Sequence, residues 1–139
     1  MKYSKTNTGY LLRLFKGERI IESLVKFCLE ERITSGSITA IGGASSITLG
    51  YYDLATKEYS WKDFPEVYEI VSLNGNISLV DGVPFIHAHT VITDRSFNAF
   101  GGHLKEGIVA ATCEVFVNPS DETFSRKMDD EIGLKLLDL

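Results

Sequence analysis

The sequence predicts an α+β domain with a largely antiparallel β-sheet and one main amphipathic helix. Apolar residues recur at helical spacing between residues 18 and 32. Most of the remaining chain consists of short stretches in which apolar and polar residues alternate, separated by glycine-, proline- and asparagine-containing turns. A chain of 139 residues fits one domain, residues 1–139, and is long enough to bury a core.

A strand and then the helix open the predicted order of elements. Residues 10–15 are predicted as a strand that Lys16-Gly17 ends. The helix follows, and Glu18 near its start suits the positive end of the helix dipole. Its predicted buried stripe consists of Ile20, Ile21, Leu24, Val25, Cys28 and Leu29. Residues 34–36, Thr-Ser-Gly, end the helix.

The rest of the chain is predicted to be mostly β. Strands are expected at residues 37–41, 47–53, 57–64, 67–73, 77–80, 84–92 and 107–117. Gly42-Gly43 is interpreted as a tight turn or a close approach of two backbones, and Asn74-Gly75 is a strong hairpin-turn signal. Further turns are expected at residues 54–56, 81–82 and 93–96, and a short helical or irregular turn at residues 120–130. The apolar tail, residues 132–139, is expected to be tied down.

Charge and composition disfavour several classes of protein. The formal net charge is -5, from 19 acidic and 14 basic residues, which disfavours direct binding to nucleic-acid phosphates. No apolar stretch is long enough to span a membrane, and the first residues lack an apolar signal region, so we expect a cytoplasmic protein. Cys28 and Cys113 lie in apolar patterns and are expected to be buried and unpaired.

The three histidines of the chain, His87, His89 and His103, fall within one short stretch. On a strand, residues i and i+2 project from the same face, so His87 and His89 would lie side by side. A turn at residues 93–96 would bring His103 back beside them, and Gly101-Gly102 gives the backbone freedom to orient the third ring. The simpler interpretation is that they are polar residues of a solvent-facing strand. The spacing favours a metal site.

Three imidazoles are typical of an open zinc site, since a fourth coordination position remains free. Nickel, manganese or iron would also accept imidazole. Asp94 is the carboxylate nearest to the histidines in sequence. It is expected to stabilise the turn rather than to support a metal-binding histidine as its hydrogen-bond partner. Glu69, Glu106 and Glu114 are possible acids or bases by type, although each is more simply a surface or structural carboxylate.

These motifs resemble the plants and prokaryotes conserved (PPC) domain over nearly the whole chain. Phe100-Gly101-Gly102-His103-Leu104 is the most specific block. The other similar blocks are residues 38–43, 49–53 and 68–75, His87-Ala88-His89, Asp94-Arg95 and residues 133–139. One departure is visible, because many members have Gly-Arg-Phe-Glu-Ile where this chain has Glu66-Val67-Tyr68-Glu69-Ile70.

The resemblance implies a compact α+β domain that assembles as a homotrimer and holds zinc or another divalent transition metal on His87, His89 and His103. The fold implied is similar to that of acetolactate decarboxylase, which also uses a three-histidine metal site; this is an analogy of fold. Plant members carry AT-hooks that bind DNA, but this chain has no Arg-Gly-Arg-Pro core.

Two classes of function remain open at this point. The favoured one is a cytoplasmic, homotrimeric metal-binding protein whose open site binds a small molecule or supports an unassigned metal-assisted reaction. The alternative is a regulatory, DNA-associated protein-interaction module without catalytic activity. The sequence names neither a substrate nor a general acid or base.

Overall fold

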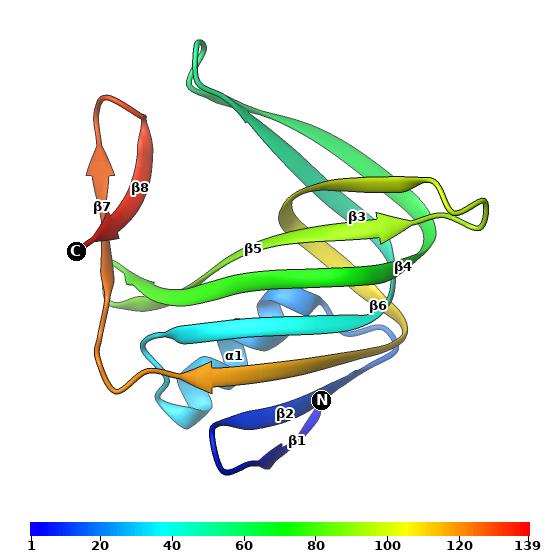
Figure 1. The fold of residues 1–139 in the computed structure, drawn as a ribbon, viewed down its shortest axis with the longest axis horizontal. Coiled ribbons are helices and arrows are strands. Elements are labelled where there is room, and N and C mark those ends of the chain that lie inside the picture. The colour runs from blue at the N-terminus through cyan, green and yellow to red at the C-terminus, as the bar shows by residue number, and fades with distance from the viewer.

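A computed structural model describes residues 1–139 as eight strands and one helix (Figure 1). In chain order the elements are β1 (Lys2–Lys5), β2 (Tyr10–Phe15), α1 (Ile20–Glu31), β3 (Gly36–Asp53), β4 (Glu58–Val80), β5 (Val83–Thr93), β6 (Ala99–Pro119), β7 (Ser125–Asp129) and β8 (Leu134–Asp138). The expected fold class, a mostly antiparallel sheet with one helix, is confirmed. No helix is long and apolar enough to cross a membrane.

The four longest strands form a closed circuit. β3 pairs with β4 and β6, and β5 pairs with the other edges of β4 and β6, all antiparallel. β2 and β1 extend the sheet beyond β6, while β7 joins β4 through a single parallel bridge between Leu79 and Ser125. The hairpin that joins β5 and β6 places the end of β5 directly beside the start of β6.

The helix packs against one face of the sheet, and the core lies between them (Figure 1). Ile20, Leu24 and Cys28 are buried as the helical stripe predicts, but Leu29 is 57% exposed and Phe27 is buried instead. Phe27 belongs to the buried side because Tyr3 and Tyr10 pack edge-on against its ring. Cys28 and Cys113 are both buried and free, as expected.

Two predicted turns are wrong, and close packing explains both. Gly42-Gly43 lies within β3, where register shifts mark bulges, and a Cβ on Gly42 would sit 2.2 Å from the Thr112 carbonyl oxygen. Asn74-Gly75 lies within β4, and a Cβ on Gly75 would sit 2.4 Å from the His87 carbonyl oxygen. Both glycines therefore serve close backbone approaches, which was the second interpretation of Gly42-Gly43.

The ends of the chain contain strands where none was predicted. Residues 120–124 are irregular, which was one of the two expected alternatives, but residues 125–129 form β7, and the tail forms β8, which pairs with β7. β1 pairs with β2 at the edge of the sheet. β1 and β7 are short and mostly polar, so they lack the apolar alternation that reveals the central strands. The tail is tied down, as expected.

The sheet face opposite the helix carries exposed apolar residues. Ile41, Val71 and Phe116 are each more than half exposed, on three adjacent strands. Residues directly opposite one another on paired strands share a face. One such cross-strand row, here called the outer row, runs across five strands through Leu11, Phe116, Thr39, Asn74, His89 and His103. The histidines therefore share the outer face with the exposed apolar residues.

Candidate metal centre

The structure brings His87, His89 and His103 together. His87 and His89 alternate with the buried residues Ile86, Ala88 and Thr90 along β5, so both project from the outer face. His103 on β6 lies directly opposite His89 in the strand pairing. The chain reverses direction through residues 94–98, between β5 and β6, where the sequence predicts a turn.

The geometry of the cluster suits a single ion. One possible ligand atom from each histidine lies within 4.8 Å of those of the other two. The ring centroids are 5.2 Å apart for His87–His89 and His87–His103, and 5.5 Å apart for His89–His103. A zinc ion would hold imidazole nitrogens at about 2.0–2.1 Å, so small rotations of the side chains would be needed to bring the three donors onto one ion.

Burial keeps two of the imidazoles neutral. It lowers the pKa of His103 to about 4 from the usual 6.5, and the neighbouring His87, His89 and Arg126 add to the effect. Burial also lowers the pKa of His87, with contributions from Arg126 and His89. Neutral imidazole is the form that binds a metal, so both rings are ready to coordinate at neutral pH.

His103 has a nitrogen that no group of the protein satisfies. Its Nδ1 is buried and has no hydrogen-bond partner. A buried polar atom without a partner is costly, and metal coordination is one way to use its lone pair. The donor set and this unpaired nitrogen both fit zinc or a similar transition metal.

Arg126 of β7 is a charged neighbour of the cluster, and no pattern in the sequence indicated its role. Its Nη2 lies 3.3 Å from His87 Nδ1 and donates to Asn76 Oδ1, while its Nε donates to Ser78 Oγ. The guanidinium also lies over the ring of Phe85, 5.3 Å from the centroid. Asn76 pairs with His87, and Ser78 with Phe85, so Arg126 spans two adjacent cross-strand pairs.

Aromatic side chains of β4 border the other side of His103. The Tyr59 ring lies 5.2 Å and the Trp61 ring 6.1 Å from the His103 ring, measured between centroids. Tyr59 and Trp61 stack on each other at 4.6 Å, and Lys105 Nζ lies 4.8 Å from the Trp61 centroid. This aromatic wall was not predicted as part of a site, although both residues alternate onto one side of their strand.

The hairpin that carries Arg126 also contacts the β3–β4 hairpin. Tyr52 Oη donates to the Ile132 carbonyl, and Lys57 Nζ donates to the Asp130 carbonyl. The two hairpins thus meet near the cluster, one supplying Arg126 and the other supplying Tyr59 and Trp61.

None of the carboxylates considered from the sequence joins the cluster. Glu106 accepts hydrogen bonds from the Ile21 and Glu22 amides, at the start of α1, and therefore caps the helix. Asp94 accepts bonds from Ser96 and Asn98 within its turn, which confirms the turn role. Glu69 and Glu114 are exposed.

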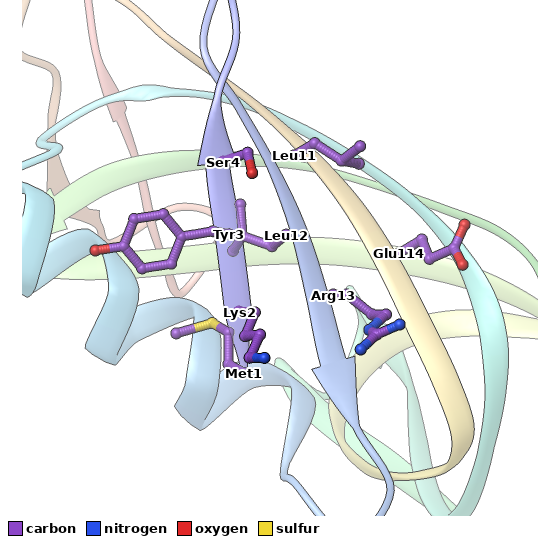
Figure 2. Close-up of a pocket in the computed structure, with 8 residues that line it drawn as sticks. All are labelled: Met1, Lys2, Tyr3, Ser4, Leu11, Leu12, Arg13 and Glu114. Atoms are coloured by element: carbon purple, nitrogen blue, oxygen red, sulfur yellow. The ribbon is translucent and has the colours of Figure 1, made fainter.

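A separate cavity of about 560 Å³ lies at the β1–β2 edge (Figure 2). Figure 2 shows its lining, which comes from Met1, β1, β2 and Glu114 of β6. Its polar groups include Lys2, Arg13 and Glu114 but no histidine. Arg13 and Glu114 are direct cross-strand partners, so opposite charges already face each other there. The histidine cluster lies on β5 and β6 instead.

Comparison with known proteins gives the family. The model of the Plants and Prokaryotes Conserved (PCC) domain matches residues 1–121. The chain belongs to this family. The resemblance seen in the histidine and glycine motifs is therefore confirmed.

Several solved structures are similar to this chain in fold and sequence. A plant- and prokaryote-conserved (PPC) protein from Pyrococcus horikoshii is 36% identical with a TM-score of 0.89, covering 99% of this chain and 95% of its own. A metal-containing protein from Archaeoglobus fulgidus is 39% identical with a TM-score of 0.88, covering 97% and 95%. A protein from Bacteroides thetaiotaomicron named a "putative DNA binding protein" is 33% identical with a TM-score of 0.95, covering 99% and 96%.

A curated relative places the same kind of sequence within a longer protein. The bifunctional protein GlmU of Synechococcus sp. (strain JA-3-3Ab) is 32% identical over 127 residues. The match covers 89% of this chain but 19% of that protein.

Proposed function

We propose that this chain is a homotrimeric metal-binding protein of the PCC family. His87, His89 and His103 hold zinc or another divalent transition metal, and the open coordination position binds a small ligand. The observation that carries the proposal is the convergence of three imidazoles within 4.8 Å, one of them with a buried, unpartnered nitrogen. The metal-containing relative from Archaeoglobus fulgidus, 39% identical, supports it.

The geometry supports ligand binding more directly than catalysis. A metal on three imidazoles polarises a bound carbonyl or lowers the pKa of bound water. Proton transfer would also need an acid or base nearby. No Asp or Glu belongs to the cluster, so a metal-assisted reaction remains the secondary part of the proposal.

Metal content tests the site directly. We expect protein purified without an affinity tag to hold about one metal ion per chain, and the double variant His87→Ala/His89→Ala to hold none, as measured by elemental analysis. Trp61, the single tryptophan, lies beside His103, so Co²⁺ added to the metal-free protein should quench its fluorescence.

Asp94→Asn is the matched control. Asp94 is the nearest carboxylate in sequence but bonds within its own turn, so this variant should keep its metal. Undiminished metal content in the double histidine variant would overturn the proposal.

The outer face supports the trimer. Ile41, Val71 and Phe116 expose apolar surface on adjacent strands, which is typical of a contact surface between subunits. We expect sedimentation to give the mass of three 15.5 kDa protomers, and Phe116→Lys to shift the protein toward monomer. A wild-type monomer at micromolar concentration would contradict this assembly.

A DNA-associated regulatory module is the second candidate, favoured by the description of the relative from Bacteroides thetaiotaomicron. The net charge of -5 argues against direct contact with phosphates. Gel shifts at increasing salt test it, because direct phosphate binding weakens steeply as salt rises. We expect no shift at any salt concentration.

We also propose a cytoplasmic location, which fractionation of cells that express the native chain would test.

A further inference from the structure

The position of Arg126 raises the question of what its charge is for. None of the ion pairs of the protein includes it, so no carboxylate lies within 4.0 Å of its guanidinium. Its acceptors are neutral: Ser78 Oγ, the Lys135 carbonyl, Asn76 Oδ1 and His87 Nδ1. Arg126 is therefore a partly buried, oriented cation without a counter-ion.

Metal binding to His87 would remove one hydrogen-bond acceptor of Arg126. A guanidinium only donates hydrogen bonds, so its contact with His87 requires a lone pair on Nδ1. If Nδ1 coordinates the metal, that lone pair is used. If the other nitrogen coordinates, Nδ1 of the neutral ring carries the proton. Either way, metal binding to His87 ends this hydrogen bond.

The donors that remain match a carboxylate in number. A guanidinium has one N–H on Nε and two on each Nη. Nη1 donates once, to the Lys135 carbonyl, and Nη2 would keep Asn76 after losing His87. One N–H on each of two neighbouring nitrogens is then free, as in bidentate arginine–carboxylate pairs.

The charges around the cluster also favour a negatively charged ligand. Arg126 Nη2 lies 3.3 Å from His87 Nδ1, and no aspartate or glutamate belongs to the cluster. A divalent metal would add further positive charge. An anionic ligand is the occupant that this environment favours.

We infer that Arg126 is the anion-recognition residue of the three-histidine centre, which selects small ligands that carry a carboxylate. This inference rests on the metal site proposed above. Arg126 acts by pairing with the carboxylate of a ligand that also occupies the open position of the metal.

The experiment uses the full chain loaded with Co²⁺, and glycolate and its uncharged counterpart glycolamide as probes. Visible absorption of the ion reports binding of each probe. We expect Arg126→Gln to weaken glycolate binding roughly 10- to 100-fold, as for the loss of a charge-assisted hydrogen-bonded pair, and to leave glycolamide binding unchanged. Arg126→Lys should fall between, because it keeps the charge but not the planar fork.

Lys127→Gln is the matched control. It removes the same charge from the next residue of β7, whose ammonium pairs with Asp138. It should bind glycolate like the wild type. Metal affinity provides a second measurement: without added anion, Arg126→Gln should bind Co²⁺ more tightly, because it lacks the neighbouring cation and its competing hydrogen bond to His87.

Equal glycolate affinity in the wild type, Arg126→Gln and Arg126→Lys would overturn the role of Arg126 while leaving the metal site intact. A wild type that binds no Co²⁺ would overturn the metal site and this inference together. A melting curve for each variant verifies that it is folded, and Arg126→Lys carries the test should Arg126→Gln fail to fold.

Discussion

Glu106 and His103 lie three residues apart on β6, and their surroundings differ completely. The Glu106 carboxylate accepts hydrogen bonds from the amides of Ile21, Glu22 and Gly107 and lies 3.5 Å from Arg19 Nε. His103 Nδ1 is buried with no partner at all. The first side chain is satisfied within the fold, whereas the second is satisfied only by something that the chain does not supply.

This difference separates structural polar groups from functional ones. Glu106 stabilises the start of α1, where a carboxylate meets amides that have no partner within the helix. The histidines instead face one another and a cation, Arg126, which disfavours their protonated forms. A polar cluster that is unfavourable by itself and well placed for a ligand is typical of a binding site.

Replacing His103 should give the largest effect of all, because it should weaken metal binding without destabilising the fold. We expect His103→Leu to lower the affinity for Zn²⁺ more than roughly 100-fold, because loss of a direct ligand exceeds the effect of losing an outer partner. The metal-free variant should be more stable than the wild type by about 1 kcal/mol, since an unpaired buried nitrogen is removed. Competition with a chelating dye and urea unfolding measure the two quantities.

Glu106→Ala should do the opposite: it should destabilise the fold without weakening zinc binding. It leaves the amides of Ile21 and Glu22 without their acceptor and should lower the free energy of unfolding by roughly 2 kcal/mol. Zinc affinity should stay at the wild-type value, and Glu106→Gln, which can still accept, should lose less stability. A parallel loss of zinc would show that the two regions are not independent.

The pH dependence of the metal-free protein is the smallest of these effects. His103 titrates at about 4 in the folded chain and near 6.5 when unfolded, so between these values the unfolded chain binds more protons. The stability is therefore complete above pH 6.5 and falls as the pH drops toward 4. Between pH 7 and 5 we expect a loss of about 1 kcal/mol after allowance for solvent screening.

Urea unfolding at the two pH values measures this loss, and His103→Leu should show a weaker dependence. The lowered pKa of His87 acts in the same direction, so some dependence should remain in the variant. An unchanged pH dependence in the variant would mean that His103 is not responsible for it.

Periodicity and spacing predicted much of the fold and the histidine cluster. Strand-like apolar patterns predicted β2, β5 and residues 107–117 of β6, and the i, i+2 rule placed His87 and His89 on one face. The glycines led to two wrong turn predictions, because glycine is favoured both in turns and where two backbones approach closely. Gly75 was predicted as a turn, yet it faces the backbone of β5.

Arg126 and Glu106 could not be assigned from the sequence for a different reason. Arg126 meets His87 across 39 residues, and Glu106 meets the Ile21 amide across 85. No local pattern encodes these contacts, which depend on the closed circuit of strands and on the docking of β7 beside β4. The spacing and the family resemblance both pointed to the three histidines, but neither pointed to the side chains that surround them.

The outer row has a thermodynamic consequence for the proposed trimer. Phe116 and His89 belong to one continuous row of side chains, so a neighbouring subunit that covers the apolar part also lies close to the histidines. If assembly of the subunits strengthens metal binding, linkage requires metal binding to strengthen assembly by the same free energy. Dilution of the protein would then release metal, and removal of metal would dissociate subunits.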